Sequence, residues 1–498
     1  MKKIVYLPLD ERPCNYNYPY SLSRDGTLYC MVRPKLHEMG EKKTPAKYEK
    51  IANFLTRESR DADYLILAID TLLYGGIVPS RLHHEKAETL QKRLSILDEI
   101  KKDNPKLKIF AFSLVMRCPC YTDNSEEPHY YGICGREIFL YGQNEHKYAL
   151  GLIGKDDYTN EKKRLAICEP YIKDYTDRRK CNLSLFLNTL RLVGKTIDEF
   201  VILQDDSNPY GYTAMDQAKV RSIIGELGIS VDIYSGADEG GMTLLSRVLV
   251  DIAGHAPKVF PVFPRPQSKD VIPIFEDRAV HKSISAQIRS AGAVECASEA
   301  EADILLFCNL NDTQTYDIYF NDVTQSDESY IPSFVDKMNT SLKKGRGVAV
   351  ADIAYCNGSD ITLLNEIEKK IGILKLWGYA GWNTSSNTLG TVICQAVSRY
   401  LFGDTAAHRH FTAERVVDDA VYSRIVRRLM IATELEKMGY SKNDTKDKRG
   451  EASKRILDLL NEYTRSLYPS ISEKYKITDC YMPWKRLFEV GIEIKERQ

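Results

Sequence analysis

The sequence predicts an α/β protein with a core of parallel strands. Short apolar runs rich in β-branched residues alternate with longer segments of helical apolar spacing, which is typical of a parallel sheet covered by helices. The chain has 498 residues, of which 43% are hydrophobic and 29 are glycine. This length exceeds that of one minimal domain, and the apolar content is too high for a disordered chain. We therefore expect a globular protein of enzyme size.

Nine apolar runs are predicted strands. They span residues 3–9, 64–69, 109–115, 200–204, 231–235, 258–262, 304–308, 348–351 and 376–380. Helices long enough to act as right-handed crossovers between parallel strands are predicted at 87–101, 183–193, 215–227 and 242–253. Nine strands suit a barrel-like or doubly wound core, and a closed eight-stranded barrel is the main alternative to open sheets.

Three regions are predicted along the chain. Residues 1–270 form an N-terminal α/β core lobe, and residues 271–400 form a second, smaller α/β lobe. Five prolines between residues 256 and 273 exclude a helix there and mark the division. Residues 401–498 form a helical C-terminal region, because the strand pattern ends near residue 401. No internal repeat is visible.

Charge and apolar patterning exclude several classes of protein. The 69 basic residues balance the 69 acidic residues, which argues against nucleic-acid and membrane partners. No apolar run approaches the roughly 20 residues of a membrane-spanning helix, and charged residues end the first run before a signal peptide could form. We expect a soluble, cytoplasmic protein whose twelve cysteines are reduced.

Charged residues follow five consecutive predicted strands. The residues expected to bind substrate at these positions are Asp10, Arg12, Asp70, Tyr74, Arg81, Arg117, Tyr210, Asp238 and Glu239, with Asp205 and Asp206 beside them. Helix capping explains any one such residue. Five charged strand ends, two of them with Gly-Gly turns, indicate a ligand-binding site in addition to capping. Because ligands of α/β folds bind outside the carboxyl ends of strands, we expect one shared polar pocket.

The same motifs resemble those of the bacterial proteins grouped as domain-of-unknown-function family 4127. The resemblance covers nearly the whole chain. It rests on the segments 7–13, 74–76, 80–81, 205–206, 236–239 and 379–384, together with Asp70. It implies a bacterial, cytoplasmic, uncharacterised protein of this length. Since the family has no assigned activity, the chemistry must be inferred from the residues.

The sequence lacks the motifs of nucleotide-binding proteins and of zinc hydrolases. No G-x-G-x-x-G follows a strand, and Gly194-Lys195-Thr196 lacks the first glycine of a phosphate loop. The G-x-S-x-G elbow of serine hydrolases is missing as well. The histidine pairs lack the i, i+4 spacing of a zinc site. No cofactor is predicted, although the strand-end carboxylates are suitable ligands for a divalent cation such as magnesium or manganese.

Asp205 and Asp206 are the predicted catalytic pair. Adjacent acids at a strand end point in different directions, so one can stay ionised while the other, with a raised pKa, donates a proton. The pair is similar to the Asp-Asp pair at a barrel strand end in glycosidases that use the substrate's own acetamido group. A structural interpretation remains open, in which Asp206 caps the turn 209–211 and Asp205 pairs with an arginine.

A second polar segment, 377–390, is expected at the rim of the same pocket. Trp382, Asn383 and Asn387 lie there, and aromatic faces beside amides suit a sugar-binding cleft. The leading hypothesis is a cytoplasmic hydrolase of a small polar substrate, with a glycoside favoured. The alternatives are a carboxylate-metal lyase or isomerase of sugar acids, and a non-catalytic protein that binds a small molecule.

Overall fold

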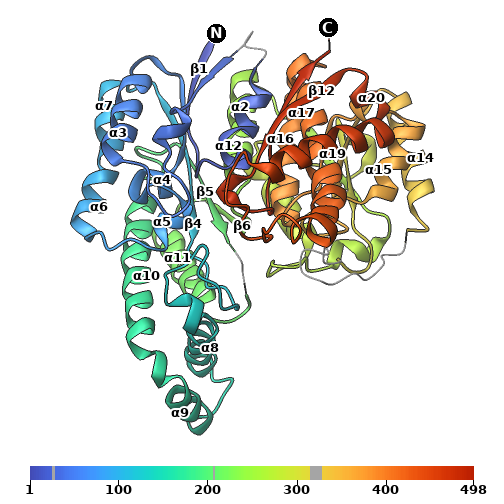
Figure 1. The fold of residues 1–498 in the computed structure, drawn as a ribbon. Helices are drawn as coiled ribbons and strands as arrows, with labels where there is room; N and C mark the ends of the chain where they lie inside the picture. Colours follow the sequence, from blue (N-terminus) through green and yellow to red (C-terminus); the bar gives the residue numbers. More distant parts are fainter. Residues whose placement is uncertain (25–28, 206–207, 315–327, 498) are drawn as a thin grey trace. The chain divides into compact units, whose positions relative to one another are not determined.

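The chain folds into two compact units, each built around its own sheet. The computed structural model describes residues 1–24, 29–205, 208–314 and 328–497 (Figure 1). Unit 1 consists of Met1–Glu11, Thr27–Gly241 and Phe275–Asp277. Unit 2 consists of Arg12–Gly26, Met242–Ile274 and Arg278–Gln498. The second sheet begins at Lys258, within the residues expected to belong to the N-terminal lobe.

Unit 1 contains a parallel six-stranded sheet with the order β2-β1-β3-β4-β5-β6. Its strands are β1 (Lys2–Leu7), β2 (Tyr29–Val32), β3 (Tyr64–Ala68), β4 (Lys108–Val115), β5 (Glu199–Gln204) and β6 (Asp232–Ser235). The direction in which strands are added reverses between β1 and β3, which pair with Leu7 opposite Leu67. Such a reversal is the switch point where doubly wound folds bind ligands.

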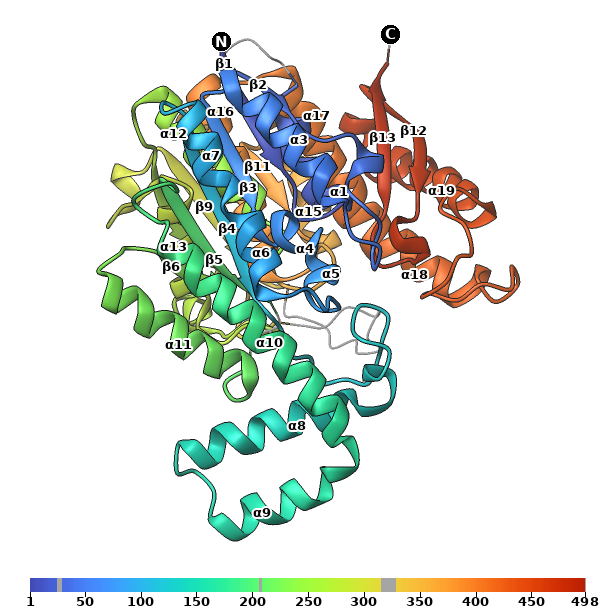
Figure 2. The same cartoon turned by 90° about the vertical axis from the view of Figure 1, so that its left-hand side faces the viewer.

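The helices of unit 1 connect these strands. They are α3 (Tyr48–Glu58), α4 (Ile69–Tyr74), α5 (Ile77–Ser80), α6 (Ala87–Leu94), α7 (Ile96–Asp103), α8 (Tyr131–Ala149), α9 (Lys155–Arg164), α10 (Glu169–Leu190) and α11 (Tyr212–Leu227). A single helix suffices for a crossover, but the connection from β4 to β5 contains α8, α9 and α10. In Figure 2, α8 and α9 project away from the sheet of this unit.

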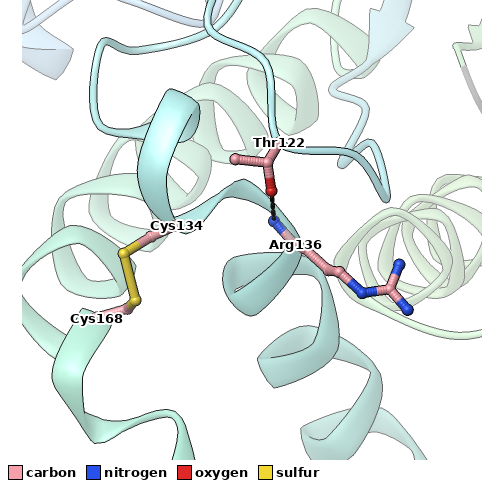
Figure 3. Close-up of a disulfide and its surroundings, with 4 residues drawn as sticks. All are labelled: Thr122, Cys134, Arg136 and Cys168. Atoms are coloured by element: carbon pink, nitrogen blue, oxygen red, sulfur yellow. Dashed lines mark hydrogen bonds between the residues drawn. A yellow bond between two sulfur atoms is a disulfide. The ribbon is translucent and has the colours of Figure 1, made fainter.

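A disulfide between Cys134 and Cys168 ties the first turn of α8 to the residue before α10, with 6.2 Å between the Cα atoms (Figure 3). Nearby, the backbone N–H of Arg136 donates to Thr122 Oγ1 at 3.3 Å. The expectation that all cysteines are reduced is therefore wrong for this pair. The two cysteines stand 34 residues apart, and only the fold of the β4–β5 connection brings them together.

Unit 2 contains a parallel five-stranded sheet with the order β11-β10-β9-β7-β8. Its strands are β7 (Lys258–Val262), β8 (Val294–Glu295), β9 (Ile304–Asn309), β10 (Gly347–Asp352) and β11 (Gly378–Ala380). Numbered within each unit, both sheets share the order 2-1-3-4-5, and unit 1 adds a sixth strand. The two sheets therefore repeat one topology, which the sequence pattern did not predict. Both sheets are open, so the closed-barrel alternative is wrong.

The C-terminal region is helical, as predicted, but it ends in a two-stranded antiparallel sheet. The helices of unit 2 include α1 (Pro13–Tyr16), α2 (Tyr18–Leu22), α13 (Val280–Ser290), α14 (Ile331–Lys343), α15 (Ile361–Lys370), α16 (Ser385–Phe402), α17 (Ala406–Arg415) and α19 (Glu451–Leu467). Helix α12 (Gly240–Ala253) begins at the boundary between the units. The strands β12 (Tyr475–Tyr481) and β13 (Gly491–Glu496) follow α19. Among the described helices, none combines the length and apolar character needed to span a bilayer.

All nine predicted strands are present, which confirms the α/β class with parallel sheets. The sequence pattern missed β2, β8, β12 and β13. Strand β8 has two residues, too few to show alternation, and three of the six residues of β13 are charged.

Candidate active site at the sheet edge of unit 1

A small pocket lies at the carboxyl ends of β3, β4 and β5. Its cavity volume is about 30 Å³. Five residues that the sequence analysis singled out line it, namely Asp70, Tyr74, Arg81, Arg117 and Asp205. They follow three strands that are neighbours in the sheet, so the parallel topology itself gathers them at one edge.

Asp70 stands in the first turn of α4, directly after β3, and is 5% exposed. Its Oδ2 accepts hydrogen bonds from Ser113 Oγ at 2.9 Å and from the Leu114 N–H at 3.1 Å. Burial raises the pKa of Asp70 to about 6, although these hydrogen bonds and the charge of Arg81 oppose the change. Asp70 can therefore hold a proton close to neutral pH.

The turn after α4 brings Arg81 to the pocket. Gly75, at φ +85°, ends α4 in the left-handed conformation that favours glycine. The short helix α5 follows, and Arg81 comes directly after it. Arg81 Nη2 donates to Asp205 Oδ2 at 2.7 Å, and Arg117 Nε lies 4.0 Å from the same oxygen. Two guanidinium groups thus face the Asp205 carboxylate, whose side chain is 14% exposed.

Two glutamates that the sequence analysis missed complete this charged group. Arg81 Nη1 donates to Glu126 Oε2 at 3.2 Å, and Arg117 Nε donates to Glu127 Oε1 at 2.8 Å. Glu127 is fully buried. Both glutamates lie in the loop after β4, further from the strand end than Arg117. Searching the whole loop for charged residues would have found them.

Helices α10 and α11 supply the remaining polar lining. Arg179 forms an ion pair with Asp216 and donates to the carbonyl oxygen of Arg117 at 3.0 Å, which holds the loop after β4. Asn182 Oδ1 lies 2.6 Å from His83 Nε2, and the His83 ring stacks on Tyr74 at 4.6 Å. These residues belong to helix interiors and to the turn after α5, so a rule about strand ends could not find them.

Four other predicted residues of unit 1 do not line this pocket. Asp10 and Asp238 are buried in the loops after β1 and β6. Glu239 is also buried, its Oε2 accepts from the Ala237 N–H at 3.0 Å, and burial raises its pKa to about 8. Tyr210 contacts the His146 ring edge-on at 5.9 Å. Asp206 lies outside the described residues.

The remaining predicted residues, Arg12, Trp382, Asn383 and Asn387, belong to unit 2. Arg12 Nη1 donates to Glu489 Oε1 at 3.4 Å and lies over the Trp484 ring. Trp382 is half-buried, and its Nε1 donates to Thr391 Oγ1 at 3.2 Å. Asn383 adopts φ +49°, and its carbonyl oxygen accepts from the Asn357 N–H at 2.8 Å. Asn387 is buried in the first turn of α16, where Thr384 caps its N–H.

Unit 2 has a buried acidic group of its own at the ends of β9 and β10. Asp352 accepts hydrogen bonds from Asn309 Nδ2 at 2.8 Å and from Tyr379 Oη at 3.0 Å. Burial, with the charge of Asp360, raises the pKa of Asp352. Asp360 caps α15 through the N–H groups of Thr362 and Leu363, a structural role.

Within the described part of the chain, no three or more His, Cys, Asp and Glu side chains are grouped so that they could hold a metal ion. No curated protein matches the sequence. The model of the family described as "Protein of unknown function (DUF4127)" matches residues 4–493, nearly the whole chain. The chain therefore belongs to this family of unknown function.

Proposed function

We propose that unit 1 is a hydrolase of a small polar substrate and that Asp70 and Asp205 are its catalytic carboxyl groups. One observation carries the proposal: two carboxyl groups that line one pocket have opposite surroundings. Asp70 is buried beside neutral groups, whereas Asp205 faces Arg81 and Arg117. Carboxyl groups whose environments separate their protonation states are typical of acid–base catalysis.

The two groups have complementary parts in hydrolysis. Asp70, with a pKa of about 6, donates its proton to the leaving oxygen as the bond to that oxygen breaks. Asp205, which lies beside two guanidinium groups, accepts a proton from the attacking water, whose oxygen forms the new bond. Arg81 and Arg117 hold the Asp205 carboxylate in position.

A glycoside is the favoured substrate class. Glycoside hydrolysis uses a pair of carboxyl groups, and the Tyr74 ring adds an aromatic wall of the kind that sugars pack against. The cavity of about 30 Å³ is far smaller than the roughly 300 Å³ or more of a site that encloses a drug-sized ligand. Only the reacting end of the substrate would enter it.

A panel of chromogenic glycosides, assayed with the wild type and three variants, tests the proposal. Asp70→Asn and Asp205→Asn are expected to lower kcat/KM by about two to four orders of magnitude, the usual contribution of one acid or base. Asp61→Asn, an exposed carboxylate of the same unit, is the control. Asp206→Asn tests the alternative pair: if it alone abolishes hydrolysis, Asp70 is not the acid.

The pH profile gives a second test of Asp70. Wild-type kcat/KM should fall as pH rises above about 6, because Asp70 loses the proton that it must donate. At pH 8, Asp70→Asn should also be more stable than the wild type, since a buried charge is removed. Full hydrolysis by Asp70→Asn would overturn the assignment. If the wild type binds a sugar tightly but does not hydrolyse it, the protein is a binding protein and not a hydrolase.

A further inference from the structure

Helix α9 is a surface element that packs on one side only. None of its ten residues is buried, and both Figures 1 and 2 place it at the far end of the β4–β5 connection, beyond α8 from the sheet of unit 1. Isolated helices shorter than about 12 residues are marginal in water. This helix must therefore draw its stability from its packing.

The inner side of α9 is defined by its contacts with α8. Tyr158 stacks on Tyr148 with 4.2 Å between ring centroids, and Tyr158 Oη donates to Glu145 Oε1 at 2.8 Å. Lys162, four residues on, donates to the same Glu145 oxygen at 3.3 Å. At 100° per residue, the opposite side of the helix carries Asp156, Asn160 and Lys163.

Apolar residues flank that opposite side at both ends. Leu152, in the turn before α9, is 55% exposed, and Ile167, in the turn after it, is 84% exposed. We call Leu152, Asp156, Asn160, Lys163 and Ile167 the outer stripe. Spacings of four and three residues keep Asp156, Asn160 and Lys163 on one side of α9, and Leu152 and Ile167 lie in the turns at its two ends. Six of the eleven large apolar residues exposed in the described chain lie between residues 121 and 167.

The outer stripe is complementary to itself when it is reversed. When a second copy is turned about a two-fold axis near Asn160, Asp156 meets its Lys163, and the turn that carries Leu152 meets the turn that carries Ile167. The side chains of Asp156 and Lys163 form no ion pair or hydrogen bond with any residue of the described chain, so both charges are available. A two-fold interface requires a surface that is complementary to itself, because each contact between two residues occurs twice.

We propose that two copies of this chain associate through an antiparallel pairing of their α9 helices along the outer stripe. The disulfide beside Ile167 holds the end of the stripe in place before binding, which lowers the entropic cost of association. One helix face per partner is a small interface, so the dimer is weak and reversible. The pairing is independent of the function proposed for the pocket.

Charge reversal tests the pairing and its direction. In a dimer of Asp156→Lys, the new lysine of each copy faces Lys163 of the other copy. In a dimer of Lys163→Glu, the new glutamate of each copy faces Asp156 of the other copy. Each variant alone should raise the dimer Kd about tenfold or more, because like charges are opposed twice. Mixed together, the two variants pair lysine with acid at both positions. Their heterodimer should return to within about threefold of the wild-type Kd.

Sedimentation velocity of the full chain, from about 1 μM to about 1 mM, covers the range expected of a small interface. Fluorescent labelling of one variant reports the heterodimer. Lys106→Glu, an exposed charge reversal in the turn before β4, is the control and should leave Kd unchanged. A wild type that stays monomeric throughout, a dimer insensitive to both reversals, or a mixture that fails to restore association would each overturn the proposal.

Discussion

At the residue scale, Gly236 shows how closely the loop after β6 is packed. Its φ of +147° lies in a region that L side chains rarely adopt. A Cβ atom at this position would stand 1.9 Å from Glu239 Oε1, whose side chain folds back to accept the Ala237 N–H. The glycine in the segment 236–239 is thus required by the buried glutamate three residues later.

Gly236→Ala should lower the free energy of unfolding by about 2 to 5 kcal/mol, because backbone strain and the collision with Glu239 add together. Gly254→Ala is the matched control. Gly254 also has positive φ, at +72°, but no atom would lie within 4 Å of the new Cβ, so the cost should be about 1 to 2 kcal/mol. Urea denaturation measures both. Equal losses would mean that the Glu239 side chain moves aside at no cost.

At the element scale, the β4–β5 connection both completes the pocket and extends away from it. Its helix α10 supplies Arg179 and Asn182 to the pocket lining. The part before α10 contains α8 and α9, and the disulfide closes a loop around both helices. A cross-link over 34 residues stabilises a loop by about 3 to 4 kcal/mol in the chain-entropy description.

Replacing both Cys134 and Cys168 with serine should therefore loosen α8 and α9 while leaving the sheet of unit 1 intact. Hydrogen exchange measured by mass spectrometry should show faster exchange in 131–164 and unchanged exchange in β4. Cys120→Ser, a free and exposed cysteine, is the control.

Alkylation of the denatured, unreduced protein counts its free cysteines and so tests whether Cys134 and Cys168 are bonded. It should label ten of the twelve cysteines, since two of twelve are bonded to each other. Labelling of all twelve would show that the bond does not form in the protein as prepared.

At the scale of the whole molecule, buried carboxyl groups with raised pKa values occur in both units. Burial raises the pKa of Asp70 to about 6 and that of Glu239 to about 8 in unit 1. In unit 2 burial raises the pKa of Asp352, and it also raises that of Asp419, which accepts hydrogen bonds from Arg415 and the Gly381 N–H. Unfolded carboxyl groups titrate near pH 4. At these four groups the folded protein therefore binds more protons than the unfolded chain between about pH 4 and pH 8.

Stability should accordingly fall as pH rises from 5.5 to 8, because the folded state must ionise these groups at a cost. Exposed acids with lowered pKa values, such as Asp61, act in the opposite direction only at lower pH. Burial lowers the pKa of His408 to about 4, which opposes the change below about pH 6.5, so the slope should be steepest between pH 6.5 and 8. Urea denaturation at several pH values measures the slope. Glu239→Gln and Asp352→Asn should each flatten it, by a few kcal/mol at most.

Asp61→Asn, at an exposed position, should leave that slope unchanged. A protein whose free energy of unfolding increases from pH 5.5 to 8 would contradict the prediction. So would a slope that neither buried variant alters.

The sequence by itself determined nine of the thirteen described strands and the charged side chains that follow five of them. Local apolar periodicity specifies where a buried strand ends, and a charged residue there must face the sheet edge or a partner. Asp70, Arg81, Arg117 and Asp205 could be chosen on that basis. Five of the six strands in the sheet of unit 1 and four of the five in the sheet of unit 2 were recognised in this way, and β2 and β8 were not.

Only the tertiary structure decided which strand ends are neighbours. Strand order depends on crossovers between distant segments, so Asp70 and Asp205 share a pocket while Asp10 and Asp238, equally charged and equally placed after strands, do not line it. The same holds for Arg179, which lines the pocket from a helix of the β4–β5 connection, and for Glu127, which binds the pocket residue Arg117 from the loop after β4. Local patterns describe each segment separately, whereas a site is defined by long-range packing.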